Sequence, residues 1–250
     1  METSLSECSS LRPEGRSARV EAVLFDYGQV LSCPPDAEAW GRIRAITGLD
    51  EERLHEAYWR FRHDYDRAAL TGVAYWHAVA DQTGIALDDA QIEALFEADV
   101  DLWTRLNRPM VNWARRLQRA GMRTGILSNI GDCIAYGIIA RLPWLSGFYH
   151  CTWSHELRMA KPEPEIFVKT AEALGTEPAK ILFIDDREDN VAAAAALGFQ
   201  TIHYGQHAAF EREMRRRGLG YLLDIGLDAD AAGEGELALD AEPAANQAAK

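Results

Sequence analysis

The sequence predicts an α/β protein: a doubly wound parallel sheet in a Rossmann-like core, with an inserted helical cap subdomain. Two observations predict this fold. Short apolar runs, typical of buried strands, alternate with segments of helical spacing over most of the chain. The segment 33–107 interrupts this alternation and contains only helical patterns. With 250 residues, 48% of them hydrophobic, the chain can bury a large core.

Five apolar runs bounded by polar residues predict the strands. Because helical segments separate most of them, we expect the strands to pair in parallel, with helices on both faces of the sheet. In such sheets, ligands bind at the carboxyl ends of the strands. The runs are VEAVLFD (20–26), MRTGILSN (122–129), GFYHCTWS (147–154), AKILFIDD (179–186) and FQTIHY (199–204).

Three core helices are predicted between these strands. Each has helical spacing of its apolar residues and a glycine at its C-terminal end, where a left-handed backbone conformation favours glycine. The helices cover 110–121, 163–175 and 190–198, and they end at Gly121, Gly175 and Gly198.

The segment 33–107, here called the helical insert, carries four further helical patterns, at 36–48, 50–70, 72–84 and 87–106. The insert leaves the chain from the C-terminal end of the first strand. Because ligands bind at that end of a parallel sheet, we expect the insert to cover the site as a cap.

The predicted domain organisation has a core flanked by two polar ends. The first residues are rich in serine, and the last are rich in alanine and acidic residues without a period, so we expect both to be disordered. The bounds are 1–18 for the N-terminal segment, 19–32 and 108–222 for the core, 33–107 for the cap, and 223–250 for the tail.

Composition excludes several classes of function. The net charge of −13 argues against a nucleic-acid or anionic-membrane partner, since these partners need clustered Lys and Arg. The four cysteines show no zinc spacing and predict reduced thiols in a cytoplasmic protein. We find no signal peptide, and no apolar run long enough to span a membrane.

Polar residues follow the predicted strands at the points where the strands end. In a parallel sheet these ends converge, so we expect the side chains to share one crevice. They are Asp26 after the first strand, Ser128 and Asn129 after the second, Lys161 shortly after the third, and Asp185, Asp186 and Asn190 at the fourth.

Clustered carboxylates repel one another unless a cation lies among them. Hard oxygen ligands favour Mg²⁺, which binds one or two carboxylates together with a substrate phosphate. Lys161 would balance further charge, and Ser128 precedes a helix N-terminus that could face an anion. The chemistry that fits is phosphoryl transfer, with Asp26 as nucleophile and an aspartyl-phosphate that water hydrolyses.

Each of these residues alone has an ordinary structural explanation. Asp26 could be a turn residue, Ser128 with Asn129 a helix cap, Lys161 a surface lysine, and DDREDN a polar loop that opens a helix. Their combination favours the functional interpretation, because all of them lie at strand ends and an insert follows where it would cover them.

The order LFDYGQVL, GILSN, KPEPEIF and ILFIDDREDN resembles the four motifs of the haloacid dehalogenase-like hydrolases. The resemblance covers about residues 20–206, and the helical insert resembles the small cap type of this family. The most similar subgroup is a set of phosphatases with a first motif of the FDxGxV type. It includes sugar-phosphate phosphatases and the N-terminal domain of soluble epoxide hydrolases.

The resemblance implies roles for residues of this chain. Asp26 would be the nucleophile, Ser128 and Asn129 would bind the phosphoryl group, and Lys161 would stabilise both Asp26 and the transferring phosphate. The implied substrate is a small phosphorylated metabolite, such as a sugar phosphate. The implied protein is a monomer or a homodimer.

The resemblance also implies a Mg²⁺ site. Asp26, Asp186 and the main-chain carbonyl of Gly28 would ligate the metal. Asp185 would contact the catalytic lysine or reach the metal through water, and Asn190 would support the loop.

Gly28 departs from the pattern of most phosphatases in the family, which have an aspartate there as general acid and base. Tyr27 should point away into the core, because side chains alternate along a strand, and the neutral amide of Gln29 cannot serve as an acid. General acid–base catalysis contributes about 10²–10⁴-fold in rate. We therefore expect a preference for leaving groups that depart easily, such as anomeric, acyl or aryl phosphates.

Other residues of the helical insert could complete the site. His63, Asp64 and Asp66 are less favoured substitutes for the acid, because we expect them on a solvated helix face. Most of the aromatic residues of the insert should form its core, with one or two lining the substrate pocket: Tyr58, Trp59, Phe61, Tyr65, Tyr75 and Trp76.

Two other functions remain as alternatives. A haloacid dehalogenase would use Asp26 without a metal, but the pair Asp185–Asp186 argues against it. A non-catalytic pseudo-phosphatase would explain Gly28, but it should also have lost the nucleophile and the lysine. A phosphomutase is disfavoured, since it relies on the missing acid.

Overall fold

The computed structural model describes residues 18–227, so nearly all of the predicted segment 1–18 and most of the predicted tail lie outside the described residues. Within them, five parallel strands form one sheet in the order β3-β2-β1-β4-β5. This sheet confirms the predicted fold class. The strands are β1 (Ala22–Phe25), β2 (Arg123–Ser128), β3 (His150–Trp153), β4 (Ile181–Asp185) and β5 (Gln200–His203).

The central strand β1 places the first motif between the other two motif-bearing strands. Phe25 lies opposite Ile126 of β2 and Ile184 of β4. The N–H of Asp26 donates to the carbonyl of Ile184 at 2.8 Å, so the ladder continues to the residue that leaves the strand. The ends of β2 and β4 therefore flank Asp26.

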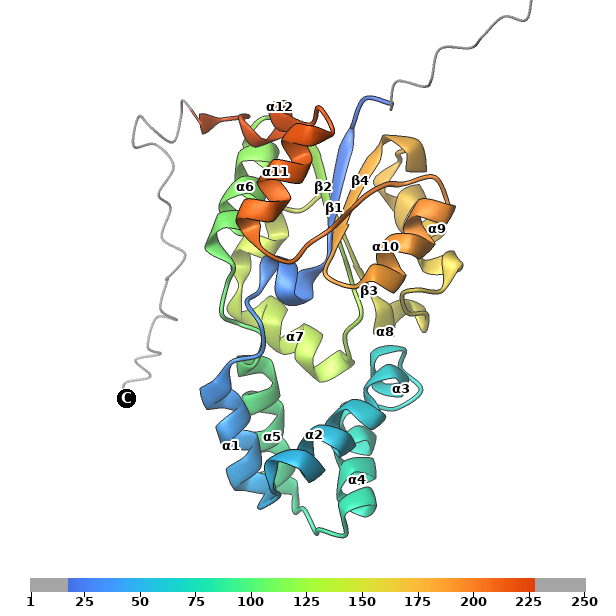
Figure 1. Ribbon diagram of the computed structural model, residues 1–250. Coiled ribbons are helices and arrows are strands. Elements are labelled where there is room, and N and C mark those ends of the chain that lie inside the picture. The colour runs from blue at the N-terminus through green and yellow to red at the C-terminus, as the bar shows by residue number, and fades with distance from the viewer. Residues whose placement is uncertain (1–17, 228–250) are drawn as a thin grey trace, which may run out of the picture.

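Helices cover both faces of this sheet (Figure 1). The alternation of side chains along β1 separates two apolar clusters. In one cluster Phe25 packs edge-on against Trp113, with their ring centroids 5.4 Å apart. Leu24 belongs to the other cluster, which contains Phe167. The core helices are α6 (Arg108–Arg119), α7 (Asp132–Arg141), α8 (Ser154–Leu157), α9 (Pro164–Leu174), α10 (Glu188–Ala196), α11 (His207–Arg216) and α12 (Gly220–Leu223).

The helical insert lies beside the carboxyl ends of the strands (Figure 1). Aspartate or threonine side chains cap the N-termini of four of its helices, as Asp36 does for α1. The helices are α1 (Ala37–Thr47), α2 (Glu51–Arg60), α3 (Arg62–Asp66), α4 (Gly72–Thr83) and α5 (Asp89–Asp101).

The helical pattern over 50–70 forms two helices, α2 and α3. The backbone leaves the helical range at Phe61, which separates α2 from α3. Helix α3 ends at Asp66, and Ala68 adopts a positive φ of 55°. This break turns α3 towards the core, a change of direction that the apolar spacing of the sequence does not encode.

The chain remains packed against the core beyond residue 223, the predicted start of the tail. Leu223 is buried, and Arg116 donates to the carbonyls of Leu223 at 3.4 Å and Ile225 at 3.1 Å. Residues 228–250 lie outside the described residues. Within 18–227, no helix has the length and apolarity needed to cross a membrane.

Candidate active site

Asp26 lies where β1 turns away from the sheet, and its side chain is almost fully buried. Its Oδ1 atom accepts a hydrogen bond from the N–H of Tyr27 at 2.7 Å and lies 2.9 Å from the ammonium of Lys161. Both donors hold the same oxygen. The carboxylate is therefore fixed in one orientation by contacts on one of its two oxygens.

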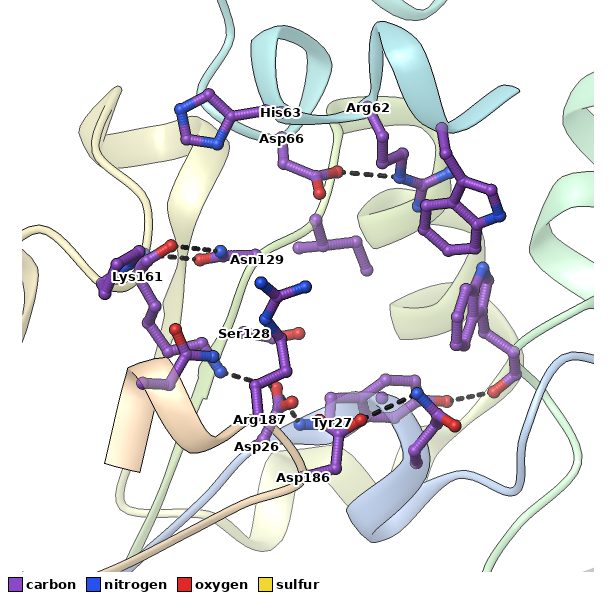
Figure 2. Close-up of a pocket in the computed structure, with 17 residues that line it drawn as sticks. Asp26, Tyr27, Arg62, His63, Asp66, Ser128, Asn129, Lys161, Asp186 and Arg187 are labelled. Atoms are coloured by element: carbon purple, nitrogen blue, oxygen red, sulfur yellow. Dashed lines mark hydrogen bonds and ion pairs between the residues drawn. The ribbon is translucent and has the colours of Figure 1, made fainter. Parts of the chain in front are cut away.

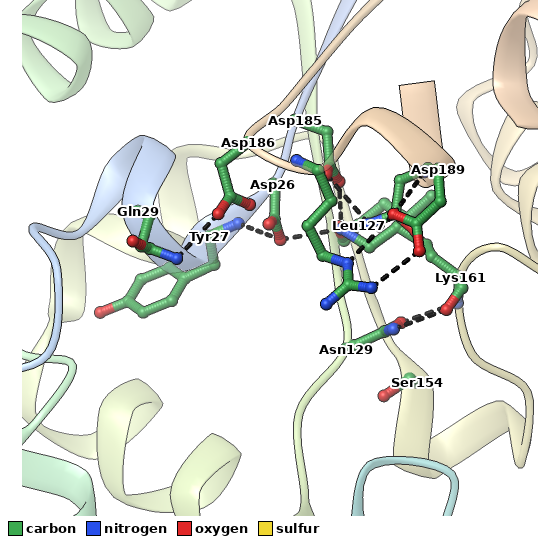
Figure 3. Close-up of polar contacts among 12 residues, drawn as sticks. Asp26, Tyr27, Gln29, Leu127, Asn129, Ser154, Lys161, Asp185, Asp186 and Asp189 are labelled. Carbon is green, nitrogen blue, oxygen red and sulfur yellow. Dashed lines mark hydrogen bonds and ion pairs between the residues drawn. The ribbon is translucent and has the colours of Figure 1, made fainter. Parts of the chain in front are cut away.

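Lys161 connects three strand ends (Figure 3). Besides Asp26, its buried Nζ donates to Asp185 Oδ2 at 2.6 Å and to the carbonyl of Leu127 at 2.8 Å. Burial alone would lower the pKa of Lys161, but the carboxylates of Asp185 and Asp26 raise it above its usual value. The lysine is therefore charged at neutral pH.

Asp185 holds this lysine and is held in turn. It is fully buried, and its Oδ1 accepts from the N–H of Arg187 and the side-chain amide of Asn190, both at 2.9 Å. Both oxygens are thus occupied by protein donors. The structure brings Asn190 into contact with Asp185, at the start of α10.

Asp26, Asp185 and Asp186 form a cluster of carboxylates, with one oxygen of each within 4.8 Å of the others. Gln29 donates its side-chain amide to Asp186 Oδ2 at 2.7 Å. Gly28 lies on the wall of the same cavity. Three carboxylates with carbonyl oxygens nearby are a donor set of the kind that Mg²⁺ prefers.

Neighbouring negative charges disfavour the ionised forms of Asp26 and Asp186. Burial, together with the negative charges of Asp185 and Asp186, raises the pKa of Asp26 to about 8, against the attraction of Lys161. Burial and the charge of Asp185 also raise the pKa of Asp186. A cation bound among these groups would reverse the effect by favouring their ionised forms.

Ser128 is the last residue of β2 and Asn129 follows it, and both line the cavity in front of Asp26. The side chain of Asn129 is engaged with the main chain of Lys161: its oxygen accepts from the N–H and its amide donates to the carbonyl, both at 2.8 Å. In this arrangement Asn129 positions the lysine, so its main-chain N–H is the group left to face an anion.

The ring of Tyr27 packs edge-on against Trp153, as expected for a core residue, although Tyr27 lies beyond the end of β1 and also lines the cavity. It is buried, and its hydroxyl donates to the carbonyl of Trp103 at 2.8 Å. Gly28 has φ −62° and ψ 130°, a conformation open to any residue. A Cβ on Gly28 would lie 3.6 Å from the ring of Trp103, so an indole lies beside the position of the missing acid.

A cavity of about 370 Å³ lies between the core and the helical insert (Figure 2). Its walls include Asp26, Ser128, Asn129, Lys161 and Asp186. Arg62, His63 and Asp66 of α3 lie on the side of the cavity opposite Asp26. Arg187 also lines the cavity, and Asp189 holds its guanidinium at 2.7 Å and 3.1 Å.

The expectation that His63, Asp64 and Asp66 share a solvated helix face is wrong for Asp66. Its carboxylate is buried, accepts from Arg62 Nε at 3.0 Å, and has a pKa raised by burial. Arg62 also donates to Tyr58, at 2.5 Å. The break after α2 turns these residues inwards, whereas Asp64 is exposed and does not line the cavity.

The helical insert and the core are joined beside the cavity. The hydroxyl of Ser154, at the end of β3, donates to the carbonyl of Asp66 at 2.5 Å and accepts from the N–H of Ile130 at 2.8 Å. A Cβ on Gly131 would lie 2.2 Å from the ring of Tyr65, so a glycine is required for this approach.

Most aromatic residues of the helical insert form its interior, as predicted. Phe61 is partly buried, and Trp59 lines the cavity and is 42% exposed. Trp103, Arg62 and Arg187 also line the cavity and were not predicted. No spacing signal marks them, although Arg187 directly follows the Asp185–Asp186 pair. The buried aromatic residues are Tyr58, Tyr65, Tyr75 and Trp76.

A family model for haloacid dehalogenase-like hydrolases matches residues 20–198. Bifunctional epoxide hydrolase 2 of Sus scrofa is 27% identical over 200 residues, which cover 73% of this chain but only 36% of that protein. N-acetylmuramic acid 6-phosphate phosphatase of Pseudomonas aeruginosa is 27% identical over 201 residues, covering 75% of this chain and 83% of that protein.

A solved structure with the same fold is that of a haloacid dehalogenase family enzyme from Bacteroides thetaiotaomicron, in complex with magnesium and inorganic phosphate. Its TM-score is 0.62 at 23% identity, and the match covers 76% of this chain and 99% of that one. At this identity the likeness establishes the shared fold.

Proposed function

Because the chain belongs to the haloacid dehalogenase-like hydrolases, we propose that it is a Mg²⁺-dependent phosphatase acting on a small phosphorylated metabolite. One observation carries the proposal: Lys161 joins Asp26 to Asp185 beside a third carboxylate, in front of a cavity. A phosphatase relative and a fold neighbour that binds magnesium and phosphate support it.

Asp26 is the proposed nucleophile. One of its oxygens is held by Tyr27 and Lys161, which leaves the other to attack phosphorus. The new bond forms between this oxygen and phosphorus while the bond to the leaving oxygen breaks, and the leaving oxygen keeps the electron pair. Water then attacks the aspartyl-phosphate, which releases inorganic phosphate and restores the carboxylate.

The proposed metal ligands are Asp26, Asp186 and the main-chain carbonyl of Gly28, with Asp185 reaching the ion through water. Bound Mg²⁺ would supply charge neutralisation for the carboxylates and for the transferring phosphoryl group. Gln29 holds Asp186 in place through its amide.

Ser128, the main-chain N–H of Asn129 and the ammonium of Lys161 are the proposed phosphate-binding groups. Hydrogen-bond donors and positive charge fixed before the reaction stabilise the charge of the transferring phosphoryl group. In this proposal the helical insert acts as a cap, and its residues Arg62, His63 and Asp66 face the leaving group.

Gly28 determines the range of leaving groups. Without an acid beside Asp26, the leaving oxygen departs unprotonated, which favours esters of acidic hydroxyl groups. Anomeric sugar phosphates, acyl phosphates and aryl phosphates belong to this class, whereas simple alkyl phosphates do not.

The test is phosphate release from phenyl phosphate by the purified protein, with Mg²⁺ and with EDTA. We expect metal-dependent release that Asp26→Asn abolishes. Asp64→Asn serves as the matched control, because Asp64 is exposed on the helical insert and does not line the cavity.

Other outcomes would support the alternatives. Undiminished hydrolysis in EDTA would contradict the proposed need for Mg²⁺, and release of halide from a 2-haloacid would point to a dehalogenase. Absence of hydrolysis on acyl, aryl and anomeric phosphates would support a pseudo-phosphatase.

A further inference from the structure

A second cavity of about 300 Å³ lies next to the candidate active site. Resting on the proposed function, we propose that this second cavity receives a flat aromatic leaving group, so that the substrate class is a phosphate ester of a phenol. Five ring-bearing side chains of the helical insert line it: Trp40, His55, Tyr58, Trp59 and Trp103.

Trp59 and Trp103 line both the second cavity and the catalytic cavity. A substrate whose phosphate binds at Asp26 can therefore extend its other end along these two indoles. Trp59 is 42% exposed, which leaves much of its ring available to a ligand. Aromatic rings stack on other rings with a preference that apolar burial alone does not give.

Trp103 is fixed beside the nucleophile. Its carbonyl accepts from the hydroxyl of Tyr27 at 2.8 Å, and its ring lies 3.6 Å from the position of a Cβ on Gly28. The general acid of related phosphatases would extend from that position. In this chain a leaving group beside Gly28 contacts an indole instead of a carboxylic acid.

The missing general acid and the aromatic walls of the second cavity both favour phosphate esters of phenols. An aryl oxygen can leave as a phenolate, because the ring delocalises its charge, so it needs no proton in the transition state. Asp26 forms the bond to phosphorus, the bond from phosphorus to the aryl oxygen breaks, and the electron pair stays on that oxygen. The phenolate then takes its proton from water.

The charge of the second cavity favours a neutral ring over a cationic group. Glu51 is the carboxylate on its wall, and other groups already engage it: Trp40 donates to it at 2.8 Å and Arg44 lies 3.3 Å away. Its negative charge is therefore offset before any ligand binds.

The experiment compares two esters whose leaving alcohols are similarly acidic but differ in shape: 2-naphthyl phosphate and hexafluoroisopropyl phosphate. Matching the acidity removes the effect of the missing acid. We expect kcat/KM in Mg²⁺ to be about tenfold higher for the naphthyl ester, with the difference mainly in KM.

Variants at Trp59 localise the preference. Trp59→Leu should lower the ratio of the two kcat/KM values about tenfold, whereas Trp59→Phe, which keeps a flat ring, should retain most of it. Tyr221→Leu is the control, because Tyr221 is equally exposed (43%) but lies on α12, at the other end of the molecule (Figure 1). Circular dichroism would verify that each variant folds.

Equal kcat/KM values for the two esters in the wild type would overturn the inference and leave the proposed function intact. So would a preference for the naphthyl ester that Trp59→Leu does not change. Failure to hydrolyse either ester, together with failure on acetyl phosphate, would overturn the proposed function and this inference with it.

Discussion

Replacing the proposed nucleophile should make the metal-free protein more stable while it removes activity. Burial and two neighbouring carboxylates raise the pKa of Asp26 from 3.8 to about 8. Because this pKa is higher in the folded than in the unfolded chain, the folded state binds more protons between about pH 4 and pH 8. The stability contributed by protonated Asp26 is therefore lost as the pH rises through this window.

The structure gives the magnitude. A difference of about four pH units, at about 1.36 kcal/mol each, means that ionised Asp26 costs about 5 kcal/mol of folding free energy above pH 8. Asp26→Asn removes the charge and keeps the shape, but it weakens the contact with Lys161. We therefore expect a net gain of about 2–5 kcal/mol at pH 8 and almost none at pH 4.

The assay is urea denaturation in EDTA at several pH values, with the two proteins compared at each. Groups that titrate alike in both proteins cancel in this difference. Asp64→Asn should show no comparable dependence on pH, and Mg²⁺ should stabilise the wild type more than Asp26→Asn. A variant no more stable than the wild type at pH 8, or a difference that is constant with pH, would refute the reasoning.

Three further predictions concern other parts of the site. Gly28→Asp should raise the rate of hydrolysis of glycerol phosphate about tenfold. This is less than the 10²–10⁴-fold typical of a general acid, because the ring of Trp103 crowds the position. An unchanged steady-state rate would contradict this prediction. Asn129→Ala loses two hydrogen bonds and should lower the free energy of unfolding, measured by urea denaturation, by about 1–3 kcal/mol. Equal stability of the variant and the wild type would mean that those bonds contribute nothing. Gly131→Ala forces a Cβ against the ring of Tyr65, so it should destabilise the protein by about 1–3 kcal/mol and change KM. A variant that matches the wild type in both stability and KM would argue against this tight contact.

The core could be predicted from the sequence because its signals are local and repeated. Each strand is a short apolar run, and each predicted core helix ends at a glycine, as α9 does at Gly175. Helix α7 was not predicted: DCIAYGIIAR is apolar on most sides, so it lacks the polar face that distinguishes a surface helix. The turn after α2 has no local signal at all.

The candidate site was predictable to the extent that parallel strands bring their ends together. That rule places Asp26 and Asp185 beside each other at the ends of β1 and β4, and Lys161 contacts both. The distance between Lys161 and Asn129 along the chain hides their pairing, which depends on the path after β3. The inward position of Asp66 depends on the break at Phe61. Burial at this position raises the pKa of its carboxyl group, which the spacing of residues in the sequence does not indicate.

The hydroxyl of Ser154 has a consequence for turnover. It contacts the carbonyl of Asp66 on the helical insert and the N–H of Ile130, directly after the proposed phosphate-binding residues. A phosphate that orders this stretch of main chain should therefore also strengthen the contact between the core and the insert, and by reciprocity this contact should tighten phosphate binding. A contact that tightens phosphate binding also slows the loss of inorganic phosphate, so that release of product, rather than cleavage of a reactive ester, would limit the rate.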